Sequence, residues 1–121
     1  MDLLNIINKA GRQRMLTQEL MKLYLIKSYN VPYSRDVNQD LLDCVEQFNQ
    51  THVLLQSISA NSLRVKLATE KVHDAWLKFI SSFEFQNMDD VIDLNKIVLE
   101  EMDQLVTELI LQFSKKHEVL T

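Results

Sequence analysis

The sequence predicts an all-α protein in which four helices form an antiparallel, up-down-up-down bundle. Its 121 residues include only one glycine and one proline. Folds built from strands and tight turns need many more of both, because such turns demand a positive or a fixed φ angle. Four segments instead repeat apolar residues at helical spacing, and the segments between them are short. The length suits one domain, which we expect to span residues 1–121.

The first two helices are expected over residues 2–28 and 36–59. The first should end before Pro32, which disfavours the helical conformation at Val31. The second places apolar side chains on one face, and the residues expected to be buried there are Val37, Leu41, Cys44 or Val45, Phe48, His52 and Leu55.

The third helix is expected over residues 63–83, with Asn61 or Ser62 as its N-cap. Its expected buried residues are Leu67, Val72, Trp76, Phe79 and Phe83.

The fourth helix is expected over residues 88–119, after Asn87 as a cap and with Asp89 and Asp90 well placed near its N-terminus. Its buried seam has heptad-like spacing and comprises Val91, Asn95, Val98, Met102, Leu105, Leu109 and Gln112. The first and fourth helices are the longest, and in this topology their free ends lie at one end of the bundle. Such a domain could connect to two membrane spans, or it could be a plain soluble bundle with frayed ends.

Composition narrows the classes of partner. The net charge of −4 and the pI near 5.3 offer no basic surplus for phosphates, so we expect no nucleic acid partner. A lone Cys44 cannot form an internal disulfide and leaves the compartment open. We expect no membrane insertion of this segment, because no apolar run approaches the roughly 20 residues of a membrane span. The N-terminus also lacks the features of a signal peptide, which suggests a cytosolic protein or a piece of a longer chain.

Arg14 is the unusual residue of the first helix. On a helical wheel it falls near the middle of an apolar arc, with Thr17 and Gln18 beside it, whereas Arg12 lies largely opposite and faces solvent. A second apolar stripe on the polar side suggests contact with a second subunit. The expected bundle arc comprises Leu3, Ile7, Ala10, Met21 and Leu25, and the second stripe comprises Leu16, Leu23 and Ile26.

A buried guanidinium is costly unless it is paired, which leaves two interpretations of Arg14. One is an internal salt bridge to an acid on another helix, in a structural or partner-binding bundle. The other is an anion site, since the forked donors of arginine fit a planar oxyanion, and Gly11 lets a ligand or a second backbone come close. Two copies of the helix at a twofold axis could then share one small anion between two Arg14 side chains.

The stretch INKAGRQRMLTQ, from Ile7 to Gln18, resembles the signature of the PilJ-type sensor domain, the N-terminal domain of type IV pili methyl-accepting chemotaxis transducers. It is also similar to the P-box helix of nitrate/nitrite sensor histidine kinases. The resemblance implies an extracytoplasmic, periplasmic bundle that dimerises and has no cofactor. In those nitrate sensors an arginine from each subunit grips one nitrate, helped by the backbone of a nearby glycine.

Carried over to this chain, the resemblance makes Arg14 the nitrate-gripping arginine and Gly11 the glycine, and Met15 and Thr17 also match the motif. We expect a ligand site formed by Gly11, Arg14, Met15, Thr17 and Gln18. Ligand binding would shift the first helices and relay that shift through the fourth helix to a cytoplasmic output module. One position departs from the family, because Glu19 stands where a second arginine is common; the wheel places it in solvent.

Other residue patterns give weaker evidence of a functional site. Glu70 and His73 have the spacing of a di-iron carboxylate motif, but such sites need a second copy and two further glutamates, so we expect no metal. His52 falls on an apolar face and lacks the flanking residues of phosphotransfer domains. The sequence has no nucleophile motif and no phosphate-binding loop, so we do not expect an enzyme. Asn95 could fix helix register or line the same polar pocket as Arg14.

Overall fold

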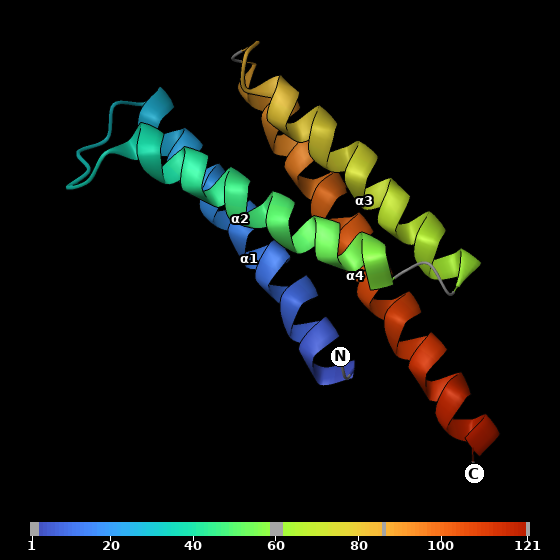
Figure 1. Cartoon of the computed structure of the whole chain (residues 1–121). Helices are drawn as coiled ribbons and strands as arrows, with labels where there is room; N and C mark the ends of the chain where they lie inside the picture. The colour runs from blue at the N-terminus through green and yellow to red at the C-terminus, as the bar shows by residue number, and fades with distance from the viewer. Residues whose placement is uncertain (1–2, 59–61, 86, 121) are drawn as a thin grey trace.

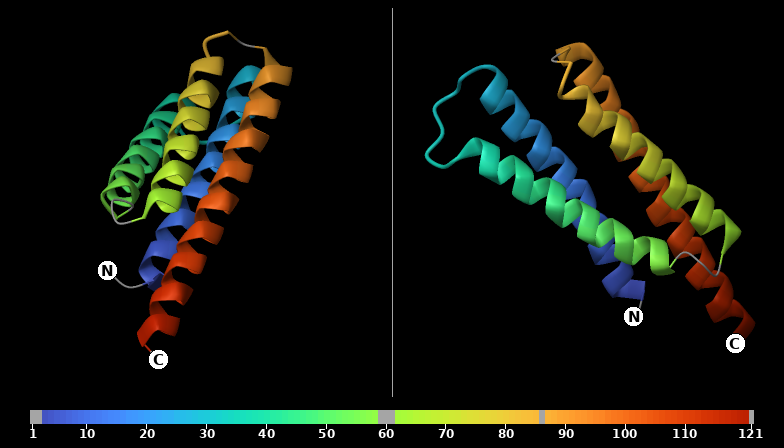
Figure 2. Two further views of the ribbon diagram at one scale, coloured as in Figure 1. Left: turned by 90° about the vertical axis from the view of Figure 1, so that its right-hand side faces the viewer. Right: turned by 45° about the horizontal axis from the view of Figure 1, so that its top comes forward.

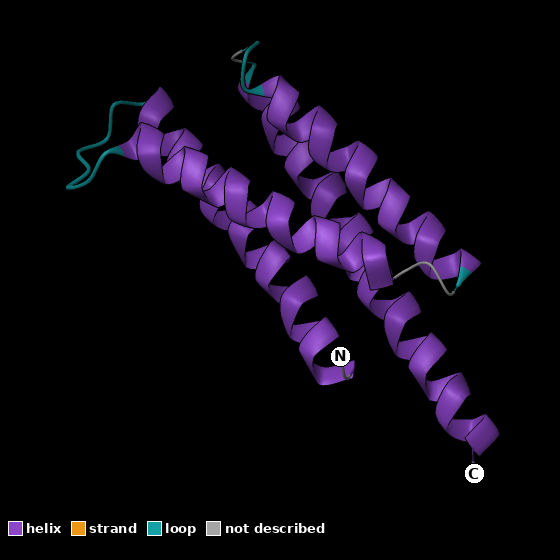
Figure 3. Cartoon of the chain, in the orientation of Figure 1, coloured by secondary structure: helices purple, strands orange, loops and turns teal. Residues whose placement is uncertain are grey.

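The computed structural model describes the backbone of residues 3–58, 62–85 and 87–120, and the side chains of residues 4–57, 62–85 and 87–112. This part of the chain forms four α-helices and no strand (Figure 3). Their bounds agree closely with the predicted ones: α1 is Leu3–Ser28, α2 is Val37–Ile58, α3 is Leu63–Ser82 and α4 is Met88–Leu120. The all-α prediction is confirmed.

Side-chain caps fix where the last three helices begin. In each case an oxygen of the capping side chain accepts a hydrogen bond from a backbone N–H of the first turn, which would otherwise lack a partner. The pairs are Asp36 with Gln39 at 3.1 Å, Ser62 with Val65 at 3.4 Å and Asn87 with Asp90 at 3.3 Å. Ser62 and Asn87 are confirmed as caps, and Asn61 lies outside the described residues.

The end of α1 is set by Asn30, whose φ of 50° is in the left-handed region. Its N–H donates to the carbonyl of Lys27 at 3.4 Å, and the N–H of Val31 donates to the carbonyl of Ile26 at 3.0 Å. This pair of bonds is the Schellman motif, which satisfies the last carbonyls of a helix. Pro32 follows directly, so the chain turns away as predicted.

The helices run up, down, up and down, and both termini lie at the same end of the bundle (Figures 1 and 2). α1 packs against α2 and α4, and α3 packs against α4, whereas α2 and α3 make few contacts with each other. The molecule is therefore two helical hairpins joined mainly along α1 and α4. We call the end with the two chain termini the terminal end and the opposite end, with the α1–α2 and α3–α4 connections, the turn end.

The first and fourth helices are the longest, as predicted, with 26 and 33 residues against 22 in α2 and 20 in α3. The last turns of α4 extend beyond the start of α3 at the terminal end (Figure 2).

Aromatic rings fasten the two hairpins where α2 meets α3. The rings of Phe48 and Trp76 stack with centroids 3.6 Å apart, and the Trp76 indole N–H donates to Asn49 Oδ1 at 3.1 Å. Both rings are almost fully buried, at 0% and 3% exposure. Because this interface has few other contacts, these side chains supply much of its burial.

The predicted core faces of α2 and α4 are confirmed, except that Val37, Leu41, Asn95 and Gln112 are only half-buried. Cys44 lies in the α2 face, and its burial raises the pKa of the thiol, with a smaller contribution from the carboxylate of Glu19. On α3, Val72, Trp76 and Phe79 are buried as expected and Phe83 is partly buried, but the prediction for Leu67 was wrong, because Leu67 is 49% exposed. It precedes Val72 by five residues, which places it about 140° away round the helix.

Candidate ligand site on helix α1

The buried face of α1 is not the one predicted. Of the predicted arc, Ala10 is buried as expected, but Ile7, Met21 and Leu25 are only half-buried, and Leu3 lies outside the described side chains. Of the stripe expected to face a second subunit, Leu16 and Leu23 are instead buried inside the bundle at 5% and 1% exposure, and Ile26 is half-buried. The buried face lies about 90° round the helix from Arg14. It comprises Ile6, Ala10, Gln13, Leu16, Thr17, Leu20, Leu23 and Tyr24.

Two polar residues at the centre of this face explain the error. Gln13 and Thr17 are fully buried, at 0% exposure. Because they are polar, the apolar residues on a helical wheel predict that the neighbouring arc is the buried one. Gln13 Nε2 donates to the carbonyl of Phe48 at 3.3 Å, and Thr17 Oγ1 donates to the carbonyl of Gln13 at 2.9 Å, whereas Gln13 Oε1 has no partner among the described residues. The two hydrogen bonds offset part of the cost of burying these side chains.

Arg14 lies at the edge between α1 and α4, with its side chain 42% exposed, so the expectation of a fully buried guanidinium was wrong. Its Nε donates to Asp103 Oδ1 at 3.2 Å, and that aspartate is 61% exposed. Nη1 and Nη2 donate no hydrogen bond to any residue that the structure describes. An exposed pair of this kind contributes about 0–1 kcal/mol, so it holds the guanidinium only loosely.

Three of the predicted ligand residues share an exposed side of the helix. Gly11, Met15 and Gln18 are all exposed and lie together with Leu4, and we call these four residues the α1 outer face. Arg14 borders this face on the side of α4. Thr17 does not join it, because Thr17 points into the bundle beside the Met102 sulfur at 3.8 Å.

Packing among the described residues does not explain Gly11. Apart from its immediate surroundings in the helix, a Cβ atom built at this position would meet no heavy atom of the described residues within 4 Å. An alanine would therefore fit, and it would favour the helix by about 1 kcal/mol. The glycine leaves an open strip of backbone on the α1 outer face.

The two neighbouring charged residues of the motif face away from this strip. Arg12 is exposed, as predicted, and its Nη2 donates to Gln47 Oε1 on α2 at 3.1 Å. Glu19 is also exposed, as predicted, and its effect on the pKa of Cys44 places it towards α2. Glu19 therefore lies on the opposite flank of α1 from Arg14.

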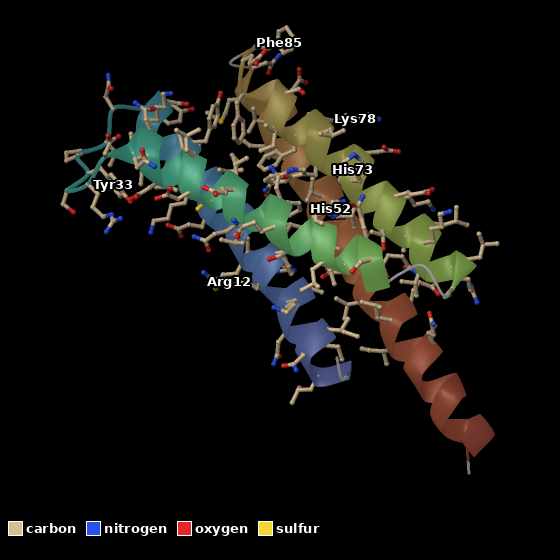
Figure 4. The ribbon with its side chains drawn as sticks, in the orientation of Figure 1. Arg12, Tyr33, His52, His73, Lys78 and Phe85 are labelled. Atoms are coloured by element: carbon tan, nitrogen blue, oxygen red, sulfur yellow. The ribbon has the colours of Figure 1, made fainter. Side chains whose placement is uncertain are left out.

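A buried histidine pair was missed by the sequence analysis. The rings of His52 and His73 stack at 5.1 Å with an angle of 8° between them, where α2 and α3 face each other (Figure 4). His52 is buried on the apolar face, as predicted, and burial followed by the nearby His73 lowers its pKa to about 4. Neither His52 nitrogen has a hydrogen-bond partner among the described residues. The pairing depends on the register of α2 against α3, which spacing along either helix alone does not reveal.

The described side chains include no group of three or more His, Cys, Asp or Glu residues that could hold a metal ion. The Asn95 side chain on α4 is half-buried, and its Nδ2 finds no partner in the described part of the chain. A search of the described helices finds none that is both long and apolar enough to cross a bilayer.

Four antiparallel helices with both termini at one end define an up-down-up-down helical bundle, whose first helix has an exposed glycine on its outer face and an arginine at the edge of that face. The chain matches the family described as "Type IV pili methyl-accepting chemotaxis transducer N-term" over residues 5–99. It therefore belongs to this PilJ family, and the resemblance of the first helix to the PilJ-type sensor domain is confirmed. No curated protein and no solved structure matches the chain significantly.

Membership places the chain among sensor domains of chemotaxis transducers, which are membrane receptors with a cytoplasmic module and are not a family of enzymes.

Proposed function

We propose that this chain is a single periplasmic ligand-binding domain, spanning residues 1–121, that dimerises through the α1 outer face and binds a small planar anion. Nitrate and nitrite are the first candidates. Arg14 from each subunit would donate to the same anion, and the exposed backbone at Gly11 would let the two helices approach. The bound state would be relayed to the cytoplasmic module of the parent receptor.

The observation that carries this proposal is the open space at Gly11. The residue costs helix stability, and no described side chain fills the space that it leaves. Its neighbours on the same face include exposed apolar side chains, with Leu4 at 67% and Met15 at 49% exposure. A twofold axis through this face would bury those side chains twice over, because the same patch then meets itself.

Arg14 is suited to bind an anion at that axis. Asp103 takes only its Nε–H, so the two terminal nitrogens can donate to a ligand. A planar oxyanion accepts such parallel donors well, and the interaction strengthens as dimerisation removes water. Two arginines without an anion would repel each other, so the anion and the dimer should stabilise one another.

The Arg14–Asp103 contact also suggests how binding could be relayed. It joins α1 to α4, and the start of α1 and the end of α4 both lie at the terminal end. An anion that competes with Asp103 would weaken this link and favour a different position of α1 against α4. The size of that shift is limited by the difference in anion affinity between the two arrangements.

The test is thermal unfolding with nitrate and nitrite, with chloride and sulfate as controls, together with sedimentation to follow dimerisation. A ligand that binds only the folded state stabilises it by about 2.7 kcal/mol at a hundredfold excess over its dissociation constant. Arg14→Ala should abolish the nitrate response. Arg12→Ala is the matched control, because it removes an exposed arginine on the opposite flank of the same helix. A nitrate response that survives Arg14→Ala would rule out this site.

The 3.2 Å contact with Asp103 favours a second candidate, a structural or partner-binding bundle in which Arg14 is only an ion-pair partner. In that case Arg14→Ala and Asp103→Ala should cost the same small amount of stability. Neither the wild type nor these variants would then respond to any anion.

A further inference from the structure

We propose a second ligand site, at the turn end of the bundle, that binds a small aromatic carboxylate between the two hairpins. The structure has a cavity there of about 440 Å³, a size typical of small-molecule sites. Residues of both hairpins line it: α1 contributes Tyr24, α2 contributes Leu41 and α4 contributes Met88, and Phe83 is the C-cap of α3. Tyr33 and Phe85 mark this end of the molecule in Figure 4.

The inner lining of this cavity is apolar and aromatic. The Tyr24 and Phe83 rings stack with centroids 4.5 Å apart and an angle of 11°, which joins α1 to the end of α3. Leu41 and Met88 are partly buried beside them and pack against the core. Flat aromatic ligands gain from stacking on such rings and from contact with a methionine sulfur.

Tyr24 has a hydroxyl with no assigned partner. Only 6% of the surface of this residue is exposed, and its hydroxyl donates no hydrogen bond to the described residues. The hydroxyl oxygen is not one of the buried side-chain atoms without a partner, so it reaches solvent and can exchange a water for a ligand oxygen. Because the same residue lines the cavity, a ligand oxygen in the cavity can take the place of that water.

The outer lining is polar and positively charged. Lys27, Ser28 and Tyr29 are exposed residues at the C-terminal end of α1, and Lys27 carries the charge among the described residues of this lining. No carboxylate within the described part of the chain pairs with Lys27. A carboxylate ligand would therefore meet an unpaired ammonium group together with two hydroxyl donors, while its ring enters the apolar part.

Such a ligand would contact both hairpins, whose helices α2 and α3 make few contacts with each other. It would favour one spacing of the hairpins over others, and α1 and α4 extend from this cavity to the terminal end (Figure 1). This site is separate from Arg14, so it does not depend on the proposed anion site.

The experiment is a titration of the whole chain with phenylacetate, followed by NMR amide shifts and by calorimetry. Three comparison ligands separate the contributions: phenylacetamide lacks the charge, acetate lacks the ring, and nitrate tests the Arg14 site. We expect saturable binding of phenylacetate with shifts around the turn end, and about tenfold weaker binding of phenylacetamide.

Conservative variants then test the residues. Lys27→Met keeps the aliphatic stem and should weaken phenylacetate binding about tenfold. Tyr24→Phe keeps the stacked ring and should weaken it about fivefold. Lys22→Met, which removes an exposed lysine elsewhere on α1, is the matched control and should bind as the wild type does.

Three results would overturn the proposal: no saturable binding up to about 10 mM, equal binding of phenylacetamide, or unchanged binding by Lys27→Met. The comparison of phenylacetate with phenylacetamide uses the wild-type chain, so it decides the matter even if a variant fails to fold. Loss of phenylacetate binding in Arg14→Ala would also overturn it, because the ligand would then occupy the other site.

Discussion

Replacing Gly11 with alanine separates the needs of one folded chain from those of an assembly. The added methyl group meets no atom within 4 Å, so the single chain can accept it without strain. Alanine in an exposed helix interior is favoured over glycine by about 1 kcal/mol. For a chain of 121 residues this corresponds to a rise of about 4 °C in the midpoint of thermal unfolding.

The same methyl group should harm the proposed dimer. Two helices that meet at Gly11 would gain two methyl groups at their closest approach, and overpacking of this kind costs about 1–3 kcal/mol. We therefore expect Gly11→Ala to raise the midpoint measured without ligand while reducing the nitrate-induced rise and shifting sedimentation towards monomer.

The two measurements can refute the reasoning separately. A lower midpoint for Gly11→Ala without ligand would mean that the folded chain itself needs the glycine. A raised midpoint with nitrate response and sedimentation unchanged would show that nothing approaches this strip of backbone, and the proposed interface would be wrong. Gln18→Ala on the same exposed face is a useful control, because it removes a side chain without adding bulk at the glycine.

Three further changes have defined outcomes. His52 titrates near pH 6.5 when unfolded but has a folded pKa of about 4, so the unfolded state binds its proton first and stability is lost as pH falls through this range. The free energy of unfolding measured with urea should be about 2 kcal/mol lower at pH 5 than at pH 7 because of this group. A His52→Leu variant in which the difference persists would contradict this explanation. Asp103→Asn frees Arg14 from its acid and should tighten nitrate binding severalfold in calorimetry; weaker binding would show that Asp103 helps to orient the guanidinium. Asn30→Gly relieves a positive φ and should raise the unfolding midpoint by a few degrees, whereas a fall would mean that the asparagine side chain itself stabilises the turn.

The sequence allowed the fold to be predicted well because the signals were local. Ser62 and Asn87 cap helices through bonds to residues three positions away, and α1 ends through local bonds around Asn30, just before Pro32. The heptad-like seam of α4 carries apolar residues at almost every buried position, so its orientation could be deduced from spacing alone.

The orientation of α1 could not be predicted because it depends on partners in other helices. The buried side chain of Gln13 donates to the carbonyl of Phe48 on α2, and no pattern within α1 reveals that partner. Because the predicted orientation of α1 was wrong by about 90°, Arg14 was expected in the core but lies at an edge of the bundle. The stacking of His52 on His73 has the same origin, since it requires the register between two helices.

The cavity at the turn end could not be predicted from the sequence, for a related reason. Its lining comes from residues between 24 and 88, brought together by the chain reversals at both connections of this end. Tyr24 and Phe83 each look like ordinary core residues when the helices are considered singly.

The reactivity of the one cysteine of the chain can report how often α2 moves away from its neighbours. Cys44 is 8% exposed, and its raised pKa keeps it as the unreactive thiol at neutral pH. A thiol reagent can modify it only when α2 moves away from its neighbours, so the labelling rate measures how often the α1–α2 hairpin opens. Ligands at the two proposed sites would slow that labelling by different amounts, and the comparison would show how each site is coupled to the same hairpin without any added probe.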